Sequence, residues 1–168
     1  PIESNTWHTP RPVSAGAASG GSGDIQEDGS ALFIGQSPDK DDYTLVIDTD
    51  LTDIHTLRLE ALTDKILPNK GPGRTKHGNF VLTEIAISAA PKNSPDEAAP
   101  VKIRSAHADV EQKDFPVSNA FDGRPQTGWA VEAEGKKLNT THTAMFALDH
   151  PVGFTNGTRF TVKLYQQY

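Results

Sequence analysis

The sequence contains no cysteine, which excludes disulfide bonds, thiolate zinc sites and cysteine nucleophiles together. It has no apolar run of about 18 residues, so it predicts no membrane insertion. Its formal net charge of −6 disfavours binding to nucleic acid, which requires a dense basic surface. Any recognition of an anionic group must therefore come from a local cluster of basic residues.

Catalytic signatures are also missing. The six histidines show neither HxH nor HExxH spacing, so a histidine zinc site has no support. There is no GxSxG motif for a serine nucleophile. Carboxylates such as Glu60, Asp64 and Glu84 are too scattered along the chain to nominate an acid and base pair. The sequence therefore predicts a protein that is not an enzyme.

What the chain does contain is turn residues and short alternating segments. Its 168 residues, with 14 glycines and 12 prolines, suit a single domain, residues 1–168, built from short strands. Apolar and polar residues alternate with the period of two that is typical of strands. Strands are expected at 31–34, 43–48, 54–62, 80–87, 101–109, 144–148 and 158–164, and a helical turn at 117–121. The segment 14–23, SAGAASGGSG, reads as a flexible loop.

The pattern of short strands and frequent turns, with almost no helical periodicity, predicts an all-β fold, a β-sandwich or jelly roll that is mainly antiparallel. In the segment IHTLRLEAL, the alternation places Ile54, Thr56 and Arg58 on one face. It places Leu57 and Leu59 on the other.

A glycine-rich loop, GPGRTKHGN at residues 71–79, is the first candidate site. It lacks the lysine and hydroxyl of the phosphate loop GxxxxGK[ST], and a strand follows it where that motif requires a helix. Its glycines allow a tightly folded loop that would hold its polar side chains rigidly. We expect this loop to form a ledge for hydroxyl or anionic groups of a glycan, although solvated surface cations are the common alternative. The candidate ligand-binding residues are Arg74, Lys76, His77 and Asn79.

A second candidate lies in NAFDGRPQTGW, residues 119–129. The carboxylate of Asp122, the hydroxyl of Thr127 and carbonyls exposed by the turn are the oxygen ligands that calcium prefers. The alternative is that Asp122 and Gly123 form only a turn, with Trp129 in the core.

Several motifs together resemble a known module. They are LRLEAL (57–62), GPGR (71–74), GNFVLTEI (78–85), AHAD (106–109) with Gln112, and FDG (121–123) with GWA (128–130). In this order they resemble the β-sandwich module of large planctomycete multidomain proteins that also carry c-type cytochrome segments. That resemblance implies an excised module of a larger chain, with the other domains of the parent protein as partners. It also implies one further strand after residue 168, whose absence would leave an open edge.

The same segments are more remotely similar to discoidin, or coagulation factor type C, modules of the galactose-binding-like class. There the LxEI strand comes last and the Asp-Gly…Thr-x-Trp pattern near the start, so the order here implies a circular permutation. In those modules the glutamate, aspartate and threonine often surround one structural calcium. The resemblance thus implies a site at Glu84, Asp122 and Thr127, and we expect carbonyls near Asn119 and Arg124 to complete it. It also implies that Trp129 is a core residue.

The sequence thus predicts a non-catalytic carbohydrate-binding module that binds a polysaccharide or glycan through surface loops and carries a structural calcium. We expect it to act outside the cytoplasm, as a periplasmic, cell-surface or secreted protein. The alternative is a structural spacer or protein-interaction domain of a larger multidomain protein. An exposed aromatic residue near the glycine-rich loop, with Trp7, Tyr43 and Phe154 as candidates, would favour glycan binding.

Overall fold

The computed structural model describes residues 6–168, which fold almost entirely into strands and turns. Three short 3-10 helices interrupt them: η1 (Pro68–Lys70), η2 (Pro95–Glu97) and η3 (Val117–Phe121). The strands are β1 (Pro12–Ala17), β2 (Gly23–Ile25), β3 (Ala31–Phe33), β4 (Asp41–Thr49), β5 (Ile54–Ala61), β6 (Glu84–Pro91), β7 (Ala99–Val101), β8 (Ile103–Ala108), β9 (His142–Val152) and β10 (Thr158–Gln166).

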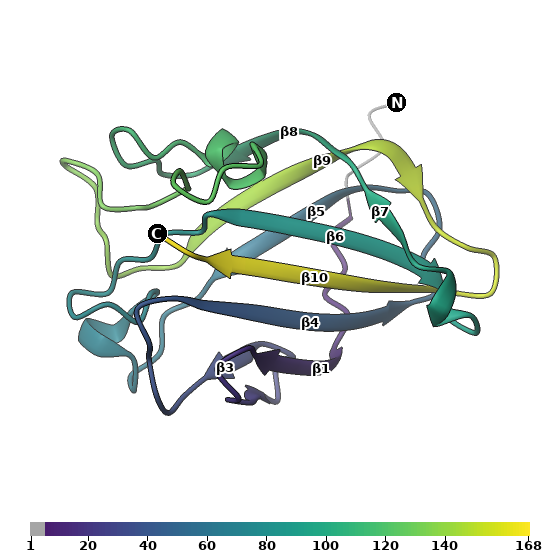
Figure 1. Ribbon diagram of the computed structural model, residues 1–168, viewed down its shortest axis with the longest axis horizontal. Helices are drawn as coiled ribbons and strands as arrows, with labels where there is room; N and C mark the ends of the chain where they lie inside the picture. Colours follow the sequence, from purple (N-terminus) through teal and green to yellow (C-terminus); the bar gives the residue numbers. More distant parts are fainter. Residues whose placement is uncertain (1–5) are drawn as a thin grey trace.

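The strands form antiparallel sheets. The larger sheet has the order β1-β4-β10-β6-β7, a second has the order β5-β9-β8, and β2 and β3 form a small hairpin. Figure 1 shows β6, β10 and β4 side by side, with β5 and β9 behind them. This arrangement confirms the predicted all-β, sandwich-like architecture.

The core is made by the inward-facing residues of both larger sheets. Ile85 and Ile87 of β6 and Phe160 of β10 join Phe146 and Leu148 of β9 in one buried cluster. Their spacing of two along each strand follows the alternation in the sequence. No helix within residues 6–168 is long and apolar enough to cross a membrane.

Strand β5 departs from the predicted face assignment at its first residue. The pairing of β5 with β9 shifts register between Ile54 and Thr56. Such an irregularity reverses the side on which the following residues lie. Ile54 therefore packs against the core together with Leu57 and Leu59, instead of sharing a face with Thr56.

The segment 14–23, which the sequence predicts to be a flexible loop, is partly strand. Residues 12–17 form β1, which pairs with β4 at the edge of the larger sheet, and Gly23 begins β2. Small residues have low strand propensity, but the unpaired edge of β4 offers backbone hydrogen bonds that override this preference.

The chain's last strand is not at a sheet edge. β10 pairs with β4 on one side and with β6 on the other. The expectation of one further strand, whose absence would leave an open edge, stays a prediction. Within the described chain, the edge strands of the two larger sheets are β1, β7, β5 and β8, and β5 has β9 as its one neighbour.

Candidate functional site

The glycine-rich loop 71–79 is tightly folded, as its glycines predict. Gly71 and Gly78 have φ of 76° and 98°, in the region that favours glycine. The Gly73 nitrogen donates to the Gly78 carbonyl at 2.7 Å. A Cβ atom on Gly73 would lie 1.9 Å from the Asn79 carbonyl oxygen, so only glycine fits there.

Arg74, one of the four expected ligand contacts, is bound to its own chain. Its guanidinium donates to the Tyr43 hydroxyl at 3.1 Å and to the carbonyls of Gly35 and Gln36 at 2.9 and 2.7 Å. These bonds fasten the loop to the segment before β4. Arg74 therefore acts as a clamp between two loops.

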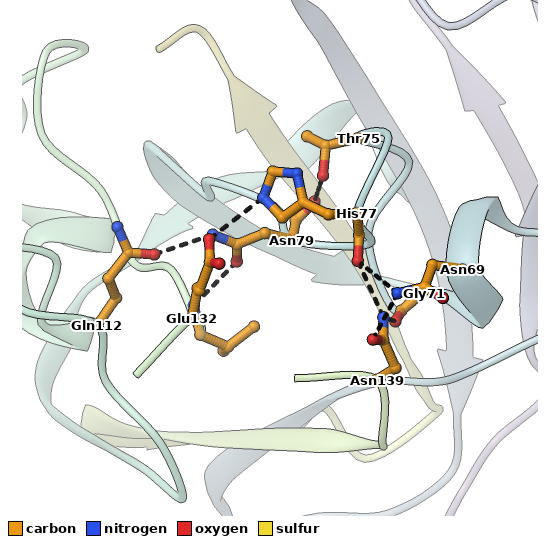
Figure 2. Close-up of polar contacts among 9 residues, drawn as sticks. Asn69, Gly71, Thr75, His77, Asn79, Gln112, Glu132 and Asn139 are labelled. Atoms are coloured by element: carbon orange, nitrogen blue, oxygen red, sulfur yellow. Dashed lines mark hydrogen bonds and ion pairs between the residues drawn. The ribbon is translucent and has the colours of Figure 1, made fainter. Parts of the chain in front are cut away.

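Asn79 is placed in the interior, away from the surface ledge expected for it. Its side chain is 7% exposed. Its amide donates to Gln112 Oε1 at 2.9 Å, and its oxygen accepts from the Val131 nitrogen at 3.2 Å. Figure 2 shows Asn79 directed towards Gln112. Asn79 thus holds the loop to the body of the protein and does not face a ligand at the surface.

The remaining ledge residues, Lys76 and His77, are exposed. His77 Nε2 lies 3.2 Å from a carboxylate oxygen of Glu132 (Figure 2). Asn139, which the loop pattern does not reveal, donates to the carbonyls of Gly71 and His77 at 2.6 and 3.1 Å. Because Asn139 is more than 60 residues from these partners, no local signal could have indicated it.

We expect Gly73→Ala to destabilise the protein by about 1–3 kcal/mol, the usual cost of forcing extra volume into a packed site. Urea denaturation measures the change in the free energy of unfolding. Gly16→Ala is the matched control, because a Cβ there meets no atom within 4 Å. Equal stability of the two variants would show that the loop backbone adapts freely and that it is no rigid frame.

The second candidate cluster does come together in space. Glu84 Oε1, at the start of β6, accepts hydrogen bonds from the backbone nitrogens of Gly123 and Arg124. The Thr127 hydroxyl lies 2.8 Å from Asp122 Oδ2 and 2.9 Å from the Arg124 carbonyl oxygen. The prediction that Glu84, Asp122 and Thr127 lie together is confirmed, although about 40 residues separate the first from the others.

The two carboxylates repel each other. Burial raises the pKa of Glu84 above its ordinary value, and the neighbouring Asp122 raises it further. Hydrogen bonds from the Gly123 and Arg124 nitrogens partly offset this rise. A cation between the two carboxylates would remove their repulsion.

The donor atoms fit a hard cation such as calcium only in part. They comprise two carboxylates, the Thr127 hydroxyl and the Arg124 carbonyl, all oxygens of the kind that calcium prefers. The Asn119 side-chain amide lies 3.5 Å from the Asp114 carbonyl, and a backbone carbonyl near Asn119 as a further ligand stays a prediction. Within residues 6–168 no three histidine, aspartate or glutamate side chains converge as metal ligands. Calcium binding here stays a prediction that depends on neutral oxygens and water to complete the shell.

A third feature, which sequence reasoning did not locate, is a cleft of about 960 Å³ between β4 and β5. The inner face of β4 contributes Tyr43, Leu45, Ile47 and Thr49, and every residue of β5 lines the cleft. The five-stranded sheet is wider than the three-stranded sheet that packs on it, so the inner side of β4 is only half-buried. Its volume falls in the range that is usual for ligand sites.

The mouth of this cleft carries an aromatic residue with polar neighbours. Residues 6–10 line the cleft, and Figure 1 shows the chain crossing the strands on its way to β1. The Arg58 guanidinium carbon lies 4.6 Å from the centroid of the Trp7 ring, a cation–π distance. Arg58 Nη2 also lies 3.1 Å from Glu60 Oε1. Trp7, Arg58 and Glu60 thus gather at one edge of β5, although Trp7 is far from the other two in the sequence.

The glycine-rich loop forms one end of the same cleft, since Gly73 and Arg74 also line it. Next to Arg74 the Tyr43 ring stacks on Phe33, with their centroids 3.8 Å apart. Of the three aromatic candidates, Tyr43 therefore lies at the loop and Trp7 at the mouth of the cleft. Comparison of the chain with protein families, curated proteins and solved structures gives no match of significance.

Proposed function

We propose that this protein is a non-catalytic carbohydrate-binding module, a jelly roll of the galactose-binding-like class, that binds a polysaccharide in the cleft between β4 and β5. The observation that carries the proposal is the exposed Trp7 beside Arg58 and Glu60 at the mouth of this cleft. Ligand sites are concave and largely apolar, with a few placed polar groups. An aromatic ring can stack on the C–H face of a sugar, while guanidinium and carboxylate groups satisfy its hydroxyls.

In this proposal the ledge residues have a supporting role. Arg74 and Asn79 fix the loop that ends the cleft, as their internal hydrogen bonds require. Calcium at Glu84, Asp122 and Thr127 holds the start of β6 to the turn that follows η3. The module acts on an extracytoplasmic glycan and is joined to other domains of its parent chain.

Trp7→Ala should weaken glycan binding by at least tenfold, about 1.4 kcal/mol, because truncated interface tryptophans commonly cost this much or more. A glycan array identifies the ligand, and isothermal titration calorimetry measures the affinity of the variant. Phe154→Ala is a matched control, because Phe154 is 37% exposed and Trp7 39%. Phe154 does not line the cleft. Equal losses in both variants would contradict a site at Trp7.

The second candidate function is a structural spacer or protein-interaction domain. It is favoured by the internal bonding of Arg74 and Asn79, which turns the predicted ledge into part of the framework. An array on which no glycan binds the wild-type protein would support this alternative.

A further inference from the structure

We propose that the cleft between β4 and β5 selects a neutral polysaccharide and binds an internal segment of its chain. This inference rests on the proposed glycan-binding function and names its ligand class. Three observations carry it: the charges that line the cleft, the edge of β5 and the length of the cleft.

The charges that line the cleft are unfavourable for an anionic glycan. The lining contains four carboxylates and two guanidinium groups. Its other titratable side chains are His8, His55 and Tyr43. The carboxylates are Asp28, Asp53, Glu60 and Asp64, and the guanidinium groups are Arg58 and Arg74. Hydrogen bonds from Ser30 lower the pKa of Asp28, so this carboxylate stays ionised near neutral pH.

Both guanidinium groups in the lining are already engaged. Arg58 is paired with Glu60 and lies over the Trp7 ring. Arg74 donates to Tyr43 and to two backbone carbonyls. Lys76 and His77, the exposed basic residues of the glycine-rich loop, do not line the cleft. A uronate or sulfate group would thus meet carboxylates without a free counter-charge, and like charges brought together disfavour binding.

Strand β5 offers the polar contacts that a neutral glycan needs. In the described chain β5 pairs with β9 only. In an antiparallel pair, the backbone N–H and C=O groups of every second residue turn away from the partner strand. Because every residue of β5 lines the cleft, these backbone groups are expected to face it. Sugar hydroxyls both donate and accept hydrogen bonds, so they match this mixed row of donors and acceptors.

The length of the cleft indicates a polymer. Every residue from Leu51 to Asp64 lines it, and its far end is formed by Pro72, Gly73 and Arg74. The eight residues of β5 alone extend about 26 Å at the usual rise of a strand. This length exceeds one sugar ring several times over. A chain lying along β5 would contact Trp7 at the mouth and the Tyr43 region at the loop end.

The test measures the affinity of the wild-type protein for neutral hexasaccharides of β-glucan, β-mannan and β-xylan and for the monosaccharide of each. Acidic oligogalacturonate is the charged ligand for comparison. We expect a neutral hexasaccharide to bind at least about tenfold more tightly than its monosaccharide. Its Kd should change less than about twofold between low and high salt, because no ion pair is screened.

Two substitutions on adjacent residues of β4 locate the ligand. Leu45→Trp fills the cleft and should reduce binding at least about tenfold. Val46, which does not line the cleft, gives the matched control Val46→Trp. Melting curves show whether each variant is folded. If Leu45→Trp does not fold, Trp7→Ala provides the second test of where the ligand binds.

The outcomes separate the inference from the function on which it rests. Tighter binding of oligogalacturonate, weakened by salt, would overturn the inference and leave glycan binding standing. Monosaccharide binding equal to that of the hexasaccharide would do the same. If no glycan binds, and heptapeptides from a display library instead bind the wild type but not Leu45→Trp, both proposals fail and β5 is an edge for strand addition.

Discussion

Trp129→Ala is expected to lower the free energy of unfolding by about 3–5 kcal/mol, the usual cost of truncating a core tryptophan. Trp129 is fully buried, at 0% exposure, which confirms its prediction as a core residue. Its ring makes an edge contact with Phe80, with centroids 5.0 Å apart, and its Nε1 donates to the Val110 carbonyl at 2.9 Å. The variant would lose this packing and leave a cavity between the sheets.

Chemical denaturation of three variants tests this expectation. Trp129→Phe should lower the free energy of unfolding by less than Trp129→Ala, because it keeps an aromatic ring in the core. It should still be less stable than the wild type, because it loses the hydrogen bond to Val110. Trp7→Ala provides the control at the surface, where truncation should change stability by less than about 0.5 kcal/mol. A Trp129→Ala protein as stable as Trp7→Ala would place Trp129 outside the cooperative core.

Calcium at millimolar concentration is expected to stabilise the protein by about 4 kcal/mol if the site has micromolar affinity. A cation that binds only the folded state shifts the unfolding equilibrium by mass action. The effect should require both carboxylates, so Glu84→Gln or Asp122→Asn should abolish it. Glu134→Gln, an exposed position outside the cluster, is the control that should keep it.

The pH dependence of this stabilisation has a definite sign. The pKa of Glu84 is raised in the folded state, so the protonated form stabilises the metal-free protein. That contribution is full below the ordinary value of 4.5 and is lost as pH rises through the raised pKa. Calcium needs both carboxylates ionised, so the stabilisation by calcium should grow over the same range of pH.

Differential scanning calorimetry with calcium or with chelator, at acidic and neutral pH, measures both effects. The side-chain amide introduced by Glu84→Gln keeps an oxygen that can accept from the Gly123 and Arg124 nitrogens, but it does not titrate. The metal-free stability of this variant should therefore depend less on pH than that of the wild type. A wild-type Tm that is the same with calcium and with chelator at neutral pH would contradict the calcium site.

The sequence by itself determined the all-β class and most of the strands. The alternation in β6 and β10 is local information, because a strand places every second side chain on the same face. Ile85 and Ile87 are accordingly buried while Ala86 between them is exposed. The glycines of the loop 71–79 likewise predicted a tight turn, because their backbone conformation is a property of the residue itself.

Only the tertiary structure decided which side chains serve the fold and which remain available to a ligand. Arg74 and Asn79 look like ligand contacts in the sequence, but distant partners, such as the Gly35 carbonyl and Gln112, engage them. The segment 14–17 became strand because β4 offered an unpaired edge. The contact between Trp7 and Arg58 joins residues that are far apart in the sequence. The cleft likewise depends on how a five-stranded sheet packs on a three-stranded one. These outcomes depend on contacts between residues far apart in the chain, which local propensity and spacing do not encode.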